Sequence, residues 1–493
     1  MTDILIPEQA FIRMPSPILS GSKEFKERVC LYRKIDEILV TSGIETQLKR
    51  LMVEREIESR ESCFEPAEQL NFQRKVSFCL RANIARTLSK GSFRRFAVEL
   101  ADSNTLQWFC GYDSPRIKKI LCRSHLHSLS KFIPEEIINE ITAELSRYLS
   151  TPNSSLLEPF DLSSVFMDST CVKLKIHHPI DWVLLKDAIK SIMTSIKCIR
   201  KHGIKHRINP PDDFIKKANK IAMAMTMTQS IRKGEAKKTR KNLFRELKAL
   251  LRIVEDHGCR YLTILQNKWA KTGLSEKQAE KISIRLINIL DQVDQIIHQA
   301  HERLIGERSI QNKDKILSLH QKHAKVYKRG KAGADVEFGL QLFIAESEKG
   351  LIINWNLRNG QPQHDSKFIK PCVDKLITTG LMPKMMSGDR GFVSKKSSDY
   401  LKKFDIKNQI CPKNKTQLKI KLKTKAFRDA ANRRSQTEGR IGILKNEFLG
   451  GALKTDGFES QHTQISWAVL THNLWVAARK CKWAEDDPIK IAA

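Results

Sequence analysis

The chain has 493 residues, enough for roughly two to four domains with separate hydrophobic cores. Hydrophobic residues make up 41% and charged residues 29% of it, a composition that excludes a disordered chain. Lysine and arginine (87) outnumber aspartate and glutamate (55), so the net charge of +32 indicates a polyanionic partner, of which nucleic acid is the commonest.

A membrane surface is the other polyanion to consider. The sequence has no apolar run of about 18 residues and no signal peptide, so we expect no membrane partner and a cytoplasmic location. Eleven cysteines occur singly, without a C-x-x-C pair, as in a reduced intracellular chain. Cys198, His202 and His206 have a spacing compatible with a metal, but Gly203 interrupts the helix that would align them, and we interpret them as structural.

Residues 1–150 are predicted to form a mostly helical N-terminal region. Asp113-Ser114-Pro115 is a typical helix start, and the helix expected after it carries four basic residues, Arg116, Lys118, Lys119 and Arg123. Such a helix suits a helix-turn-helix-like DNA-binding domain. A solvent-exposed basic face explains the same spacing, and the sequence alone leaves both possibilities open.

After a linker at residues 149–159, the pattern changes to strands. "SSVFMDST" is a short apolar run that ends in Asp168, and "CVKLKIH" is predicted to pair with it as the second strand of a hairpin. A helix begins near Asp181, with buried positions at Leu185, Ile189, Ile192, Ile196 and Ile199, and ends at Gly203.

Residues 209–312 are strongly helical and basic, and we predict a helical insertion there. Strands are then predicted at 315–320, 336–347, 350–360, 383–389 and 406–413, with helices at 365–380, 394–404 and 428–451. This order describes an α/β domain built from residues 160–208 and 313–480, with a C-terminal tail at 481–493. Lysine alternates with apolar residues in "KTQLKIKLKTKAF" (415–427), which predicts either an edge strand or, as we favour, a DNA contact.

Three carboxylates stand out in this arrangement. Asp168 and Asp389 follow apolar runs that read as strands, and sheet proteins commonly place their chemistry at strand ends. Glu438 lies on the late helix, where Arg434 and Lys445 share its face. Carboxylates from such positions can converge on two Mg²⁺ ions for phosphoryl transfer. Salt bridging between Arg434 and Glu438 on an exposed helix is the alternative explanation for that pair.

These residues also resemble a known family. "FMDST", "MMSGDRGF" and "RRSQTEGRIGILKNEF" are similar to the three catalytic blocks of DDE transposases from bacterial insertion sequences, in particular the ISNCY-like elements. "GQPQHDS" and "THNLWVAARK" support the likeness. The resemblance implies an RNase H-like mixed-sheet catalytic domain with a helical insertion, preceded by the helical DNA-binding region.

The resemblance also implies roles for individual residues. Asp168, Asp389 and Glu438 would be the catalytic residues and would hold two Mg²⁺ ions, for which Mn²⁺ can substitute. Arg434 and Lys445 would contact DNA phosphates, and Arg390 and Arg440 are further candidates for DNA contacts. Ala431 stands where the family pattern has tyrosine, which leaves any stacking role of that position in doubt.

The function implied is transposition. The protein would bind the terminal inverted repeats of its element, cleave the phosphodiester at the ends and join the 3′-OH to target DNA, as a homodimer in a synaptic complex associated with the bacterial nucleoid. Three alternatives remain at this level: a nuclease of the same fold without strand transfer, a decayed or domesticated DNA-binding protein, and an RNA-binding protein.

Overall fold

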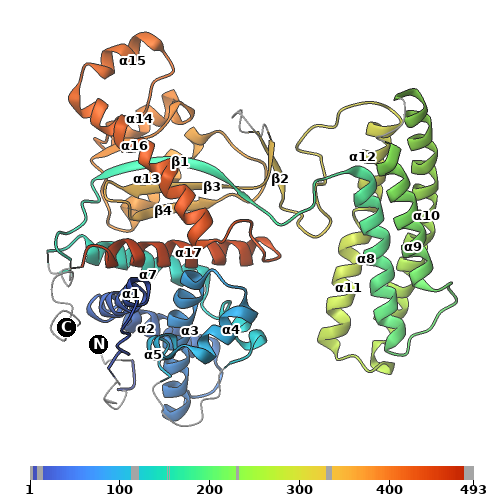
Figure 1. The fold of residues 1–493 in the computed structure, drawn as a ribbon, viewed down its shortest axis with the longest axis horizontal. Coiled ribbons are helices and arrows are strands. Elements are labelled where there is room, and N and C mark those ends of the chain that lie inside the picture. The colour runs from blue at the N-terminus through green and yellow to red at the C-terminus, as the bar shows by residue number, and fades with distance from the viewer. Residues whose placement is uncertain are drawn as a thin grey trace. The chain divides into compact units, whose positions relative to one another are not determined.

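The computed structural model describes residues 4–7, 15–112, 121–152, 154, 156–228, 233–328 and 336–481. Contacts divide the chain into two compact units (Figure 1): Met1–Lys173 together with Gln341–Ala493, and Leu174–Leu340. These limits are not those of the predicted domains, because the first predicted segment, 160–208, is divided between the two units.

The N-terminal region is helical, as predicted. Its helices are α1 (Lys23–Thr41), α2 (Ile44–Ser59), α3 (Pro66–Ser89), α4 (Phe93–Asp102), α5 (Asn104–Phe109), α6 (Arg123–Leu129) and α7 (Glu135–Leu149). Their apolar faces share one hydrophobic core with the sheet. The helix expected to begin at Asp113 falls on residues 113–120, which lie outside the described residues.

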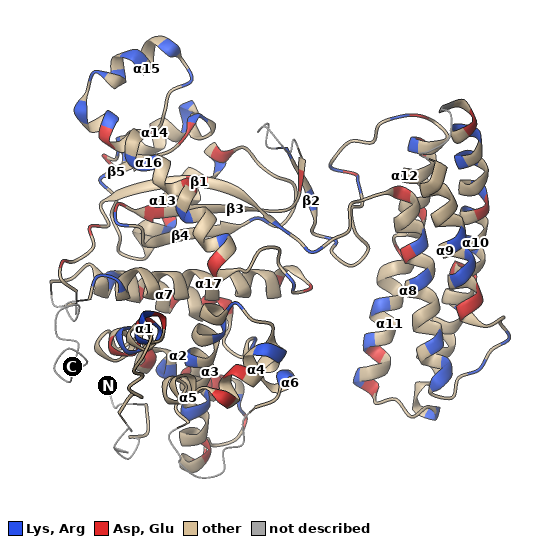
Figure 2. Cartoon of the chain, in the orientation of Figure 1, with Lys and Arg blue, Asp and Glu red and all other residues tan. Residues whose placement is uncertain are grey.

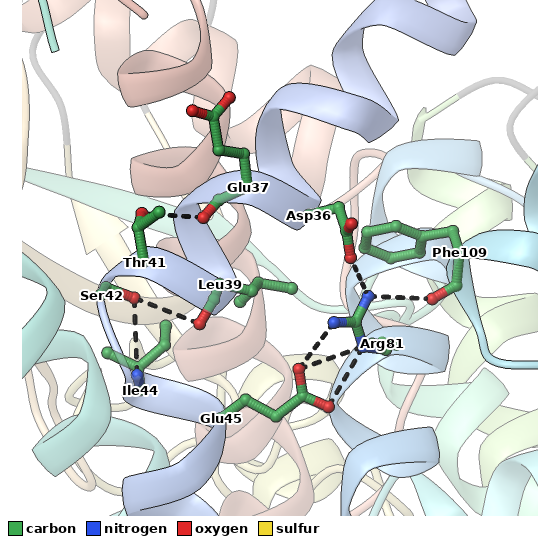
Figure 3. Close-up of polar contacts among 9 residues, drawn as sticks. All are labelled: Asp36, Glu37, Leu39, Thr41, Ser42, Ile44, Glu45, Arg81 and Phe109. Atoms are coloured by element: carbon green, nitrogen blue, oxygen red, sulfur yellow. Dashed lines mark hydrogen bonds and ion pairs between the residues drawn. The ribbon is translucent and has the colours of Figure 1, made fainter. Parts of the chain in front are cut away.

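A buried arginine joins four segments of this region (Figure 3). The guanidinium of Arg81 on α3 donates hydrogen bonds to Asp36 on α1 at 2.5 Å, to Glu45 on α2 at 2.7 Å and to the carbonyl oxygen of Phe109 at 3.2 Å. Only 8% of the Arg81 side chain is exposed. Because the charge is removed from water, it must be paired, and its contacts with two carboxylates fix the relative positions of the helices.

The sheet has the strand order β2-β3-β1-β5-β6, with β4 paired to β3. The strands are β1 (Ser164–Lys173), β2 (Lys325–Lys328), β3 (Val336–Ser347), β4 (Ile352–Leu357), β5 (Met385–Ser387) and β6 (Lys407–Asn408). β5 pairs in parallel with β1 and β6, whereas β3 pairs antiparallel with β2 and β4. This mixed α/β arrangement is the predicted RNase H-like fold.

Three predicted strands differ from the structure. Residues 164–173 form one continuous strand rather than a hairpin, because Val165–Met167 and Cys171–Val172 are all buried. Residues 315–320 contain no strand. The lysine-rich segment forms helix α15 (Lys415–Leu422) instead of an edge strand.

The remaining helices of the first unit connect the strands and cover the sheet. They are the short η3 (Asp365–Phe368) with α13 (Ile369–Thr378), η4 (Arg390–Phe392), α14 (Lys395–Lys403), α16 (Lys425–Ile443) with the π-helical turn η5 (Leu444–Phe448), and α17 (Phe458–Ala478). α17 is buried almost throughout and packs against α1, α3, α7 and β4. In Figure 1 it therefore lies between the N-terminal helices and the sheet.

The second unit contains α8 (Asp181–Lys201), α9 (Pro211–Met227), α10 (Lys233–Lys268), η2 (Trp269–Lys271), α11 (Glu276–Leu290) and α12 (Val293–Leu304). These helices enclose a core of their own, in which the predicted apolar stripe of α8 is buried. None of the described helices combines the length and the apolar character required to cross a membrane.

Candidate active site

Asp168 and Asp389 lie next to each other at one edge of the parallel part of the sheet. The last registered pair between β1 and β5 is Phe166 with Ser387, and each aspartate follows two residues after its member of that pair. Parallel strands are about 4.8 Å apart, and residues two positions apart point to the same face. The strand register therefore brings together two residues that are 221 positions apart in the sequence.

A short turn after β5 fixes the carboxylate of Asp389. Asp389 caps the 3₁₀ turn η4, and its Oδ1 accepts a hydrogen bond from the Gly391 N–H at 2.8 Å. A Cβ at position 391 would lie 2.9 Å from Asp389 Oδ1 and 2.5 Å from Asp365 Oδ2. Glycine is required here because the backbone passes directly between two carboxylates.

Glu438 and Arg434 approach this pair from helix α16. The pKa of Asp168 is raised to about 6, first by burial and further by the carboxylates of Asp389 and Glu438; the Ser169 N–H and Arg434 act in the opposite direction. The structure thus brings the three predicted carboxylates and Arg434 within electrostatic reach of one another. Glu438 itself is exposed.

A fourth carboxylate, Asp365 at the start of η3, was not singled out from the sequence. Its Oδ1 accepts hydrogen bonds from Ser169 Oγ at 2.6 Å and from Gln341 Nε2 at 3.3 Å. Its pKa is raised, mainly by burial and also by the charge of Asp389. The only sequence signal was its place in "GQPQHDS", a stretch that supported the family resemblance without indicating a role for the aspartate.

A buried ion pair beneath α16 was also missed. Glu346 on β3 is fully buried and accepts hydrogen bonds from Arg433 at 3.0 Å and from Thr437 Oγ1 at 2.8 Å. Arg440 Nε lies 3.3 Å from its other oxygen, and burial lowers the pKa of this guanidinium. Arg440, predicted to contact DNA, thus lies beside a buried carboxylate; a contact with DNA stays a prediction.

The other predicted DNA contacts lie in different settings. Lys445 Nζ donates to the carbonyl oxygen of Cys171 at 2.7 Å and to Thr170 Oγ1 at 3.3 Å, which ties the end of the late helix to β1. Arg390 is exposed next to Asp389. Arg123 begins α6, outside the site. Arg116, Lys118 and Lys119 lie outside the described residues.

The donor set is chemically suited to Mg²⁺, which prefers carboxylate oxygens and retains several water ligands. Burial is the first cause of the raised pKa of Asp168, and the neighbouring carboxylates of Asp389 and Glu438 raise it further by a repulsion that a divalent cation would relieve. In the described part of the chain, however, no three His, Cys, Asp or Glu side chains are gathered closely enough to hold a metal ion by themselves. An ion here would need ligands from substrate and water.

Comparison with known proteins agrees with this geometry. Residues 293–474 match the model of the transposase DDE domain family, a range that contains Asp365, Asp389 and Glu438. The matched residues include most of the mixed sheet and its acidic edge, so the fold and the match agree in placing the chain's α/β region in the RNase H-like class. More narrowly, residues 293–474 are similar to the DDE domain of transposases, and this match confirms the resemblance to insertion-sequence transposases. Searches of the curated proteins and of the solved structures found no match.

Proposed function

We propose that this protein is a DNA transposase that cleaves the ends of its insertion sequence and joins the freed 3′-OH to target DNA. The observation that carries the proposal is the convergence of Asp168, Asp389 and Glu438 at the edge of the parallel strands. The transposase DDE domain supports the general activity. The choice of substrate and the joining step are our inference.

Asp168 and Asp389, together with Glu438, would hold two Mg²⁺ ions in this proposal. When bound, these ions supply Lewis acidity at the scissile phosphate and lower the pKa of the attacking water or 3′-hydroxyl. Arg434, close to the same carboxylates, would orient a non-bridging phosphate oxygen by charge-assisted hydrogen bonds. Ser169 would keep Asp168 in place, because its N–H donates to Asp168 Oδ1 at 2.7 Å while its hydroxyl donates to Asp365.

The partners follow from the same argument. A net charge of +32 suits the phosphate backbone of double-stranded DNA, which includes the terminal inverted repeats and the target. Joining two ends in one reaction requires that both be held together, so the working form would be a homodimer in a synaptic complex. The N-terminal helices would recognise the repeats.

The test uses the inverted repeats that flank the gene, placed on a linear duplex with Mg²⁺ or Mn²⁺. We expect strand cleavage at the repeat end by the wild-type protein and none by Asp389→Asn, with DNA binding retained. Asp399→Asn, an exposed aspartate on α14, is the matched control and should cut normally. Equal cleavage by wild type and Asp389→Asn would place the active site elsewhere.

A plasmid target in the same reaction separates transposition from simple nuclease activity. Joined products containing the labelled repeat strand support strand transfer. Cleavage without joined products, under conditions where both ends are present, would favour the nuclease of the same fold.

A further inference from the structure

Helix α15, which precedes α16 in the chain, has almost no contact with the rest of the protein through buried side chains. None of its residues, Lys415–Leu422, is buried, and the exposed fractions of Ile420 and Leu422 are 61% and 42%. It lies at the far end of α16 from η5 (Figure 1). A helix of eight residues without a buried face gains little stability from packing, so its position must be fixed by specific contacts.

Those contacts come from three polar residues, two at the ends of α15 and one on α16. Asn414 caps the helix, with Oδ1 accepting from the N–H groups of Thr416 at 2.8 Å and Gln417 at 3.2 Å. Lys421 Nζ donates to the carbonyl oxygen of Asn408 at 2.8 Å and lies over the Phe427 ring. Arg428 Nη1 donates to the carbonyl oxygen of Leu422 at 2.8 Å. Lys421 and Arg428 thus hold the helix in place.

The remaining cations of the segment point to solvent. Between Asp405 and Asp429 the chain has eight lysine and arginine residues and no aspartate or glutamate. Six of these lysines are exposed: Lys407, Lys413, Lys415, Lys419, Lys423 and Lys425. Figure 2 shows the positive residues along this loop and helix. Like charges gathered without acidic neighbours repel one another, and a polyanion would relieve that repulsion.

We propose that α15 binds the phosphate backbone of the target DNA duplex, an inference that rests on the proposed transposase function. Lysine ammonium groups are compact point charges that suit phosphate oxygens, and phosphate contacts carry no sequence information. Here Asn414 and Arg428 are engaged in holding the helix. A surface of this composition would bind DNA of any sequence. Target DNA has no fixed sequence, whereas the terminal repeats do.

The chain connects this surface directly to the active site. α16 begins at Lys425, and Glu438 lies thirteen residues further along the same helix. At 1.5 Å per residue this is about 20 Å, the length of about six base pairs of duplex. Target phosphates bound at α15 would therefore lie about six base pairs from the phosphodiester under attack. Ile420, exposed between Lys419 and Lys421, would pack against a sugar or base edge.

The experiment measures affinity against salt concentration, in an Asp389→Asn background so that no cleavage occurs. The probes are a duplex without repeats and a duplex that ends in the inverted repeat. For the first, we expect the triple variant Lys415→Gln/Lys419→Gln/Lys423→Gln to lower the slope of log K against log salt by about 2.7, since each phosphate contact contributes about 0.9. The repeat duplex should keep its slope.

Two further variants test the assignment. The triple variant Lys216→Gln/Lys217→Gln/Lys220→Gln removes three exposed lysines from α9 and should leave the slope unchanged. Ile420→Gln should weaken binding of the duplex without repeats several-fold at an unchanged slope. Equal effects of both lysine triples, or a selective loss on the repeat duplex, would overturn the proposal. So would light scattering that shows Ile420→Gln converting a dimer to a monomer, because α15 would then cover a second copy of the chain.

Failure of this inference is distinguishable from failure of the proposed function. If α15 has another role, the α15 variants with an intact Asp389 still cleave repeat ends and join them to plasmid with normal efficiency. If the protein is no transposase, wild type produces no cleavage at the repeats whatever the salt slopes show.

Discussion

The carboxylate of Glu346 on β3 and the guanidinium of Arg433 on α16 lie 3.0 Å apart, with 1% and 10% of their side chains exposed. Thr437 and Arg440 reach the same carboxylate from the following turns of α16. These three helix residues share one face, which leaves Arg434 and Glu438 on the adjacent face near Asp168. A buried charge on the sheet thus sets the rotation of the helix that carries Glu438.

Replacing the buried carboxylate should therefore destabilise the protein. Glu346→Gln keeps the shape but leaves the Arg433 and Arg440 charges without their carboxylate, which we expect to lower the free energy of unfolding by about 3 kcal/mol. Urea unfolding followed by circular dichroism measures the change. Glu348→Gln, an exposed neighbour, is the control and should stay within about 0.5 kcal/mol of wild type. Coincident unfolding curves for the two variants would show that the ion pair makes no net contribution to the free energy of unfolding.

The pH dependence of stability should report on Asp168. Its pKa is about 6 in the folded protein against 3.8 ordinarily, so the folded state binds the proton more tightly. The protonated form stabilises the fold below pH 3.8, and this contribution is lost as the pH rises to 6 and above. Without metal, Asp168→Asn should thus be more stable than wild type by up to about 3 kcal/mol at pH 8, with the difference vanishing near pH 4. A difference that is independent of pH would contradict this account.

Magnesium should make the wild-type protein more stable relative to Asp168→Asn. Because a divalent cation neutralises the neighbouring carboxylates, Mg²⁺ in excess of its dissociation constant should raise the unfolding midpoint of wild type at pH 8. Asp168→Asn should show a much smaller rise, whereas the control Asp399→Asn should behave as wild type. Thermal unfolding with EDTA and with increasing Mg²⁺ measures the effect. The same increase in all three proteins would indicate non-specific ion binding.

The sequence patterns that point to the candidate site are local, and the catalytic roles of its residues stay predictions. The sequence alone shows the apolar runs that end in Asp168 and Asp389. It also shows the helical spacing of Arg434 and Glu438. Glu346 could not be found in this way, because it ends an apparently ordinary strand and its partner lies 87 residues away. Asp365 became relevant only through its contact with Ser169, 196 residues earlier in the sequence.

The misassigned segments have physical reasons as well. Alternation of lysine with apolar residues in 415–427 has the period of a strand, yet Asn414 caps a helix there and the sheet ends with β6. Helix α8 lies in the segment 160–208 that was assigned to the α/β domain, but its apolar stripe packs in the core of the helical unit. An apolar face shows that a helix is covered, without showing which element covers it.

The hydrogen bond from Ser169 to Asp365 offers a test of positioning. Ser169 also donates its backbone N–H to Asp168 Oδ1 at 2.7 Å, so one residue contacts two carboxylates of the site. We expect Ser169→Ala to lower the cleavage rate about tenfold, with little change in DNA affinity, because the freed Asp365 no longer fixes this strand segment. Ser163→Ala, a partly exposed serine just before β1, is the control. A loss of DNA affinity equal to the loss of rate would indicate a general structural effect instead.

The close packing of Gly391 between the carboxylates of Asp365 and Asp389 leads to a further prediction. A Cβ at Gly391 would lie 2.5 Å from Asp365 Oδ2 and 2.9 Å from Asp389 Oδ1, closer than van der Waals contact allows. Gly391→Ala should therefore push both carboxylates from their positions and reduce cleavage by about a hundredfold or more, since displacements of about 1 Å are enough for such losses.

The cost to folding should leave the protein folded, so that the loss of cleavage is not caused by unfolding. Relief of the contact by a side-chain shift is expected to take about 1–3 kcal/mol from the free energy of unfolding, with an unchanged circular dichroism spectrum. Gly234→Ala, on α10 with nothing within 4 Å of the added Cβ, is the matched control and should be as active as wild type. Cleavage of repeat ends by Gly391→Ala at the wild-type rate would contradict this account. The close packing at this edge of the sheet would then not be what positions the catalytic groups.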